Sequence, residues 1–340
     1  MSRPRIAWYV HHHGRGHVGR LLAIAPHLGA DVSCFSSLPR PDDLPDNCTW
    51  TQLERDDGVE PERALPGGDR DPTSHGLLHW APLLHDGHRR RLSVIAAALE
   101  RHPVTAFVVD VSVEVTVFAR LLGIPPVLIT QPGRRDDAAH QLAFGLATKI
   151  IAPWPEELLR PDHLSAFPHV VYVGGISRHE GRVPDPVERS GVLVLGGAGG
   201  SSVTASSVAS AAAATSEHRW SALGMSGSRD WVADPWPDMA AADVVITWAG
   251  QNSIADLAVV GARAVVIPQP RPFAEQADTA DAVRRAGLAI VHPEWPEAAE
   301  WGRILDEARA LEPDWARWRT RGAAERAASE IAAVAGGDVT

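Results

Sequence analysis

The sequence predicts an α/β protein made of two Rossmann-like domains, each built on a parallel β-sheet. Short apolar runs alternate with amphipathic stretches along the chain, which is typical of βαβ units. A length of 340 residues is too great for one ordinary core and fits two α/β domains of moderate size. In both halves, a glycine-rich segment follows a predicted strand and opens a predicted helix.

In the first half, the alternation begins almost at the N-terminus. We expect strands at residues 5–10, 31–35, 106–109, 126–130, 149–152 and 170–173, and helices at 18–28, 89–100 and 114–122. Residues 39–72 are rich in Pro, Asp and Gly and have weak periodicity. We therefore expect long loops there, either functional or disordered.

The second half repeats the pattern after a charged, proline-bearing stretch. We expect strands at residues 191–195, 244–247, 264–267 and 289–291, helices at 203–214, 253–260 and 276–286, and a helical end at 300–335 broken near Pro313. The predicted domains are 1–175 and 189–320. A linker is expected at 176–188, and a C-terminal helix at 321–340 could return to the first domain.

Composition excludes several classes of function. The net charge is −10, whereas a protein that binds nucleic acid in bulk is usually basic. The only cysteines are Cys34 and Cys48, so no disulfide framework is expected and the prediction is a reducing cytoplasm. No apolar run approaches ~20 residues, so we expect no signal peptide and no membrane span. Peripheral contact with a membrane stays open, and composition predicts no oligomeric state.

The first candidate site is the run H-H-H-G-R-G-H-V-G-R at residues 11–20, between a strand and a helix. Gly14 and Gly16 allow a tight turn and a close approach of the backbone to a ligand. Gly14, Gly16 and Gly19 also fit the dinucleotide spacing, but Asp31 comes too early to bind a ribose. NAD binding is therefore disfavoured, and a plain glycine-rich turn is the structural alternative.

His17 is the candidate general base, because it stands at the expected helix start. Asp110 ends a strand, and the C-terminal ends of parallel strands share one edge, so Asp110 is the expected orienting carboxylate. Asp110 could instead cap the next segment, and Glu114 is a weaker alternative partner. The consecutive histidines at 11–13 point alternately to opposite faces of an extended chain, so we expect no metal site.

The second half contains two further glycine-rich turns. Residues 196–201 follow a strand and are expected to approach a phosphate through Gly199, Gly200 and Ser201, without the ending of an NTPase P-loop. The turn at 248–253 also opens a helix. There, the residues expected to cap the helix and leave its amides facing a diphosphate are Gln251, Asn252 and Ser253.

Three polar side chains beyond this turn complete the predicted site. Asp256 lies one helical turn further and could bind a ribose hydroxyl pair, or serve only as a partner of the helix dipole. Glu275 and Gln276 begin the next helix, and an acidic group beside an amide suits sugar hydroxyls, which both donate and accept hydrogen bonds.

Together these residues resemble the GT-B glycosyltransferases, and above all the N-acetylglucosaminyltransferase family that makes lipid II from a UDP-sugar. The resemblance rests on residues 14–17, 196–201, 248–257 and 268–282. It implies an N-terminal acceptor-binding domain, a C-terminal domain that binds a nucleotide-sugar donor, inversion at the anomeric carbon, and neither a metal nor a cofactor. It also implies that Gly16, Gly199, Gly200, Gly250 and Gln251 lie near the donor.

The sequence departs from this family at informative places. Asp256 replaces the usual Glu, and the Asn expected after Gln276 either reads Asp281 or is displaced, which leaves the identity of the sugar open. The string G-x-G-H-V-x-R also resembles nucleotide-sugar hydrolases of the same fold, so a hydrolase or epimerase is one alternative and a catalytically silent nucleotide-binding protein is another. Residues 77–84 (L-L-H-W-A-P-L-L) are expected to be helical, either as a lip for a lipid-linked acceptor or packed as core.

Overall fold

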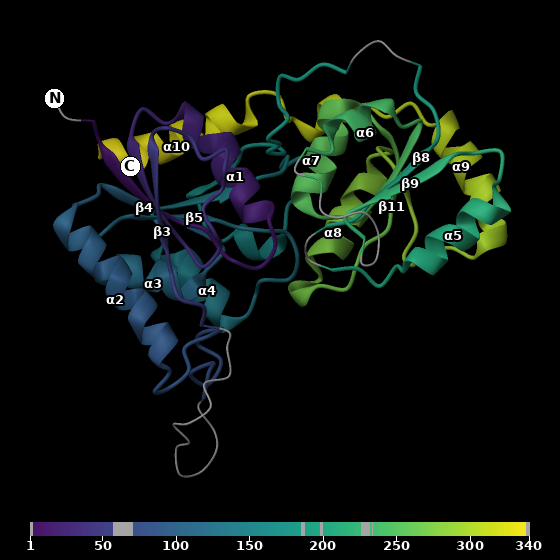
Figure 1. Cartoon of the computed structure of the whole chain (residues 1–340). Coiled ribbons are helices and arrows are strands. Elements are labelled where there is room, and N and C mark those ends of the chain that lie inside the picture. The colour runs from purple at the N-terminus through teal and green to yellow at the C-terminus, as the bar shows by residue number, and fades with distance from the viewer. Residues whose placement is uncertain are drawn as a thin grey trace.

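The computed structural model describes residues 3–56, 71–184, 188–197, 200–225, 232 and 234–337. Two sheets lie side by side, each with helices packed on its faces (Figure 1). Every strand pairing recorded within them is parallel. The prediction of two α/β domains on parallel sheets is therefore confirmed.

The first sheet has seven strands in the order β3-β2-β1-β4-β5-β6-β7. Its strands are β1 Arg5–Tyr9, β2 Asp31–Ser36, β3 Cys48–Gln52, β4 Ala106–Asp110, β5 Pro126–Ile129, β6 Lys149–Ala152 and β7 Val170–Tyr172. The helices of this half are α1 Gly16–Ile24, α2 Asp86–Arg101, α3 Val113–Leu121 and α4 Ala138–Leu146, with 3₁₀ turns η1 Ala25–His27 and η2 Asp162–Leu164.

The second sheet has five strands in the order β12-β11-β10-β8-β9. They are β8 Val192–Leu195, β9 Trp220–Leu223, β10 Val244–Thr247, β11 Arg263–Val266 and β12 Ile290–Val291. The helices are α5 Ala205–Ala214, α6 Trp236–Ala241, α7 Gln251–Val260, α8 Glu275–Arg285, α9 Trp301–Ala310 and α10 Ala323–Gly336, with 3₁₀ turns η3 Pro272–Ala274, η4 Ala298–Glu300 and η5 Trp315–Trp318.

The strand orders place the candidate sites. In the first sheet the winding direction reverses between β1 and β4, and in the second between β8 and β10. Loops that follow the two strands at such a reversal diverge and leave room for a ligand at the C-terminal edge. The segments after β1, β4, β8 and β10 carry most of the predicted site residues, and Glu275 and Gln276 follow the neighbouring strand β11, so the topology gathers them at these two edges.

The last helix returns to the first domain. Helix α10 (yellow in Figure 1) lies beside α1, and its Ala327 and Ile331 belong to the same buried apolar cluster as Leu21. Arg326 donates from Nε and NH2 to the carbonyl of Val173, at 2.9 and 2.7 Å. The small apolar residues of helix α10 thus pack on the first domain and help to cover its sheet. The predicted domain boundaries themselves stay a prediction.

Several elements differ from the expectations. Strands β3 and β9 and helices α4 and α6 were not predicted. Strand β3 is an edge strand of mixed exposure inside a stretch rich in Pro, Asp and Gly, so its period-two signal is weak. Residues 77–84 form turns and bends instead of the expected helix, and Pro82 cannot donate a helical hydrogen bond. Among the described residues, no helix combines the length and the apolar character needed to cross a bilayer.

Candidate active site

The loop after β1 brings the start of α1 against the start of α7. Gly14 takes a left-handed conformation with φ of 79°. A Cβ on Gly19 would lie 2.8 Å from Nδ2 of Asn252, so a larger residue there would push the Asn252 side chain aside. Asn252 Nδ2 donates to the carbonyl of Gly16 at 3.1 Å. The glycines of the predicted ligand loop thus also allow the two domains to touch.

His17 and Asp110 lie together at the C-terminal edge of the first sheet. His17 Nδ1 is 3.0 Å from Asp110 Oδ1, and both side chains are buried. Burial alone would raise the pKa of Asp110, but the charges of Arg20 and His17 outweigh it and hold that pKa well below its usual range. The carboxylate is therefore ionised and able to orient the imidazole.

Arg20 joins this pair to the second domain. Its guanidinium donates to both carboxylate oxygens of Asp110, from Nε at 3.1 Å and from NH2 at 2.8 Å. NH2 is also 2.7 Å from His17 Nδ1, where it competes with Asp110 for the same nitrogen. NH1 donates at 3.4 Å to both Gln251 Oε1 and Asn252 Oδ1. A buried arginine therefore contacts both candidate halves of the site.

Helix α7 begins without a side-chain cap. It starts at Gln251, and the N-cap residue Gly250 makes no capping hydrogen bond through any described side chain. The prediction that Gln251, Asn252 and Ser253 cap this helix is wrong, because the first two are inside its first turn and face Arg20. The amides of the first turn keep their hydrogen-bonding capacity and the positive end of the helix dipole, which suits an anion.

The glycine-rich loop after β8 is held by the second-domain loop that precedes α8. Gly199 lies outside the described residues. Gly200 is left-handed with φ of 81°, and its carbonyl accepts from Arg271 NH2 at 2.7 Å. The hydroxyl oxygen of Ser201 accepts from the amide of Val203 at 2.9 Å. Gly200 and Ser201 thus lie in an ordered turn beside the other predicted donor loop.

The start of α8 connects this loop to the first domain. Gln276 is buried, and its Oε1 accepts from the amide of Gln269 at 2.9 Å. Gln269 Oε1 in turn accepts from the amide of Ser202 at 2.8 Å. Glu275 faces the other way and accepts at 3.4 Å from NH2 of Arg135 in the first domain. Glu275 is therefore the more exposed member of the predicted sugar-binding pair, with its side chain 24% exposed.

Asp256 points to the segment between the domains. Its Oδ1 accepts from the hydroxyl of Ser177 at 2.5 Å. Burial raises the pKa of Asp256 to about 7, against the lowering effect of the Ser177 hydrogen bond. The residue is only partly exposed, and its carboxyl group already has a partner. Its contact with a ribose stays a prediction.

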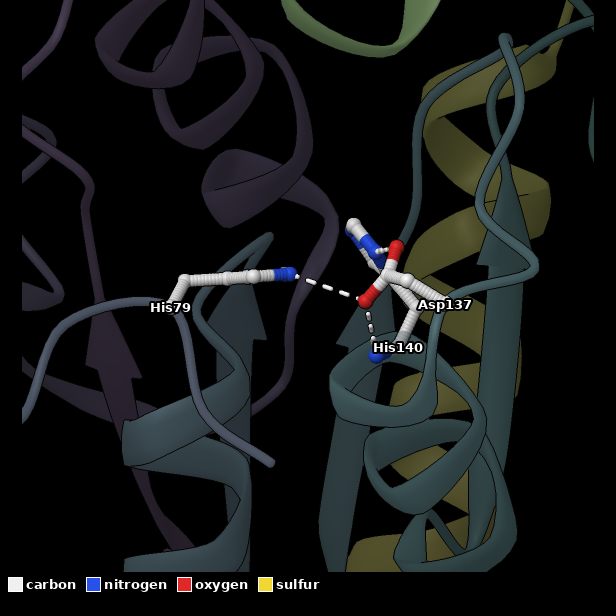
Figure 2. A group of neighbouring side chains, drawn as sticks. All are labelled: His79, Asp137 and His140. Carbon is white, nitrogen blue, oxygen red and sulfur yellow. Dashed lines mark hydrogen bonds and ion pairs between the residues drawn. The ribbon is translucent and has the colours of Figure 1, made fainter. Parts of the chain in front are cut away.

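A second polar cluster lies in the first domain (Figure 2). Asp137 is 3.1 Å from Nε2 of His79 and 2.5 Å from Nδ1 of His140. One ligating atom of each of these three residues lies within 4.8 Å of the others, so they are the described group that could hold a metal ion. Glu114, predicted as an alternative partner of His17, instead accepts from the amides of His79 and Trp80.

Sequence reasoning missed Arg20, Arg135 and the Figure 2 cluster. The sequence could have indicated Arg20, because residues three apart share a helix face and Arg20 follows His17 by three positions. Arg135 and Asp137 lie in the run R-R-D-D before the unpredicted helix α4. Their roles depend on residues far along the chain, and no local pattern shows them.

With this geometry in view, the chain can be compared with known proteins. Residues 230–298 match the C-terminal domain of glycosyltransferase family 28. The chain is 28% identical over 323 residues to the UDP-N-acetylglucosamine–N-acetylmuramyl-(pentapeptide) pyrophosphoryl-undecaprenol N-acetylglucosamine transferase of Nocardioides sp., covering 84% of this chain and 86% of the relative. It is 30% identical over 175 residues to the protein of the same name from Rubrobacter xylanophilus, covering 45% of this chain and half of that relative.

The structure of the calicheamicin glycosyltransferase has the same overall fold. It superposes with a TM-score of 0.67 at 17% identity, and the alignment covers 100% of both chains. The chain is a glycosyltransferase of the GT-B fold. The predicted resemblance is therefore confirmed. The low identity to the solved structure supports the fold alone, whereas the glycosyltransferase assignment rests on the family 28 domain and the relatives.

Proposed function

We propose that this glycosyltransferase moves a sugar from a uridine diphosphate sugar to an acceptor hydroxyl, with inversion and without a metal ion. The observation that carries the proposal is the His17–Asp110 pair, joined through Arg20 to the uncapped start of α7. The printed names of the relatives specify UDP-N-acetylglucosamine as their donor. That donor, or a related UDP-hexose, is our first candidate.

His17 acts as the base in the proposed reaction. A guanidinium can only donate, so this role requires Arg20 NH2 to give up its 2.7 Å contact with His17 Nδ1. With the hydrogen on Nδ1 donated to Asp110, the lone pair on Nε2 can then take the proton of the acceptor hydroxyl. The hydroxyl oxygen bonds to the anomeric carbon, and the bond from that carbon to the diphosphate oxygen breaks. The electron pair leaves with UDP. Attack opposite to the leaving group inverts the anomeric configuration.

The leaving diphosphate gains negative charge in the transition state. We propose that the free amides of the first turn of α7 and the turn at Gly200 and Ser201 stabilise this charge. Asp256 is the proposed ribose contact, which requires its hydrogen bond with Ser177 to open. Glu275 and Gln276 are the proposed sugar contacts.

Substitution of the base tests the proposal. We expect His17→Ala to lower the transfer rate by about 10²- to 10⁴-fold while UDP affinity by calorimetry stays within about twofold. The matched control is His13→Ala, an exposed histidine of the same loop, which should retain wild-type transfer. Full activity of the His17 variant would remove the base role. Activity lost on treatment with EDTA would refute metal independence, and retained configuration of the product by NMR would refute inversion.

The hydrolase alternative uses the same base with water as nucleophile. A screen of UDP-, TDP-, GDP- and CMP-sugars by thermal shift identifies the donor, because a specific ligand raises stability by mass action. Sugar release from that donor at an unchanged rate with and without acceptors would favour a hydrolase. Binding of UDP with no turnover of any sugar would favour the silent nucleotide-binding alternative.

We further propose that the acceptor is lipid-linked and is met at a membrane surface. Leu77, Leu83 and Leu84 are 55%, 54% and 49% exposed, so the alternative that this segment packs as core is wrong for them. The names of the relatives specify a pyrophosphoryl-undecaprenol acceptor. The nearby Arg89 and Arg90 are already ion-paired, so apolar contact would dominate.

Vesicle binding tests the membrane contact. The double variant Leu77→Ser/Leu83→Ser should lose most co-sedimentation with phosphatidylcholine–phosphatidylglycerol vesicles. The control is Leu121→Ser, because Leu121 is 78% exposed in a different element, helix α3. Equal sedimentation of all three proteins would refute a membrane contact at this segment.

A further inference from the structure

A chain of hydrogen bonds runs from the second domain to a partly exposed histidine of the first. Glu275 Oε2 accepts from Arg135 NH2 at 3.4 Å, and Arg135 NH1 lies 2.8 Å from His140 Nε2. His140 Nδ1 lies 2.5 Å from Asp137 Oδ2. Asp137 Oδ1 lies 3.1 Å from His79 Nε2, as Figure 2 shows for the last three residues. Beyond Glu275, this chain passes through groups that the proposed reaction does not use.

Arg135 determines which ring nitrogen of His140 carries the hydrogen. A guanidinium can only donate, and Arg135 donates from Nε to the carbonyls of Gln131 and Pro132 and from NH2 to Gln131 Oε1. His140 Nε2 must therefore accept from NH1. The ring of His140 then carries its hydrogen on Nδ1. Burial and the neighbouring Arg135 charge lower the pKa of His140 to about 4, which keeps the ring neutral at pH 7.

The same reasoning extends to His79. An ionised carboxylate can only accept, and Asp137 Oδ2 accepts from Nδ1–H of His140. Asp137 Oδ1 accepts from the amide of His140 at 3.1 Å and from Nε2–H of His79. In neutral His79 the lone pair therefore lies on Nδ1. Within the described ranges no group pairs with this nitrogen, and the side chain is 33% exposed.

The cluster does not fit a metal ion, although three ligating atoms converge. His140 would have to bind the ion through Nδ1, which carries a hydrogen because Nε2 accepts from Arg135. Moving that hydrogen to Nε2 would set two donors against each other at 2.8 Å. The guanidinium charge next to His140 also opposes a cation. The proton pattern therefore favours a neutral hydroxyl ligand over a metal.

We propose that His79 Nδ1 accepts a hydrogen bond from a hydroxyl of the acceptor substrate and that Asp137 holds it in this tautomer. The proposal rests on the glycosyltransferase function above and names the acceptor subsite. Two observations place it there. The ring of Phe273, which is 37% exposed, lies 5.4 Å from that of His79 and provides an apolar wall. The main chain of His79 is also fixed, because its amide donates to Glu114 at 2.7 Å.

The chemical class that fits is a hydroxyl group beside an apolar or aromatic part. Glu275, the proposed sugar contact, lies at the other end of the hydrogen-bond chain. The acceptor subsite is thus connected to the donor side through Arg135. His79 is a binding residue in this proposal, and Asp137 and His140 are positioning residues.

Nitrogen NMR of histidine tests the tautomer directly. In full-length protein labelled with ¹⁵N-histidine, we expect His79 as the Nε2–H tautomer. In Asp137→Asn, Nδ1–H of His140 still needs the amide oxygen, so we expect the amide NH₂ to face His79 and the N-cap bond that Oδ1 accepts from the main-chain amide of His140 to be lost. Nε2 of His79 then becomes an acceptor, and the hydrogen moves to Nδ1. An Nδ1–H tautomer in the wild type would overturn the proposal.

Ligand binding is measured with phenyl β-glucoside as the probe. We expect its addition to shift the Nδ1 resonance of His79, whereas the tetra-O-methyl derivative, which has no hydroxyl hydrogen, should not. His79→Ala should weaken glucoside binding about two- to tenfold, the range for one neutral hydrogen bond. The control is His75→Ala, because His75 is 91% exposed in the same segment and should bind like the wild type.

The outcomes separate this proposal from the proposed function. An unchanged Nδ1 resonance in the presence of glucoside overturns the subsite, and so does equal binding of the methylated probe. Line broadening of the His79 and His140 signals by equimolar Mn²⁺, reversed by EDTA, would overturn it in favour of a metal site. None of these readouts requires turnover, so a failed transfer assay would leave them valid.

Discussion

Removal of Arg20 should destabilise the protein more than any exposed arginine. Arg20 is 2% exposed and makes two hydrogen bonds to the fully buried Asp110, at 3.1 and 2.8 Å. Arg20→Met keeps much of the side-chain volume but leaves a buried carboxylate without its counter-ion. Breaking a buried pair on one side costs about 3–5 kcal/mol. That loss is a large fraction of the stability of an ordinary domain.

The assay is urea unfolding at pH 7, followed by tryptophan fluorescence. The control is Arg303→Met, because Arg303 pairs with Glu307 on an exposed helix face and should contribute about 0.3–0.5 kcal/mol. The double variant Arg20→Met/Asp110→Asn should recover at least half of the loss, since no charge is then buried alone. A loss below about 1 kcal/mol for Arg20→Met would refute the counter-ion role.

The pH dependence adds an independent check on the same pair. The pKa of Asp110 is lower in the folded protein than the unfolded value of about 3.9. Its ion pair therefore contributes stability that is present above about pH 4 and is lost as the pH falls through the folded pKa. The difference between wild type and Arg20→Met should shrink below pH 4. An equal difference at pH 7 and pH 3 would contradict this assignment.

Two other substitutions follow from the backbone and from burial. Gly133→Ala should lower Tm by about 2–6 °C in calorimetry. The reason is that φ of Gly133 is 101° and that the new Cβ would lie 2.2 Å from the carbonyl oxygen of Phe273. An unchanged Tm would show that the contact between the domains can shift at no cost in stability. Asp256→Asn should gain stability relative to wild type as the pH rises from about 4 to about 7, by at most about 4 kcal/mol, because the folded pKa of about 7 is raised above the unfolded value of about 3.9 and ionisation is costly in the folded protein; a pH-independent difference in urea unfolding would refute it.

The sequence could predict the site residues that follow buried strands. Strand β4 is apolar along its whole length because both faces are covered, so its end at Asp110 is visible in the sequence. Strand β1 likewise leads directly into the glycine loop and His17. Parallel strands share their C-terminal edge, and this rule alone brings His17 and Asp110 together.

The partners of these residues could not be predicted in the same way. Helix α4 is nine residues long and contains Gly145 and Ala-rich positions, so its amphipathic signal is short, and with it the cluster at Asp137 was missed. The contact between Arg135 and Glu275 joins positions 140 residues apart. A single sequence has no local pattern that reveals a contact between such distant positions. The capping prediction for α7 failed for a related reason, since Gln251 and Asn252 are drawn to Arg20 of the other domain.

Arg20 and Arg135 occupy comparable places at two ends of the contact between the domains. Each donates to partners in its own domain at 2.7–3.2 Å and to the second domain only at 3.4 Å. The short contacts across the domains instead use backbone acceptors, the carbonyl of Gly16 at 3.1 Å and that of Phe273 at 2.7 Å. Separation of the domains would therefore leave both guanidinium groups paired. In the proposed mechanism, the partners that orient His17 and His79 therefore lie within the first domain, and we expect both side chains to be positioned before a donor binds.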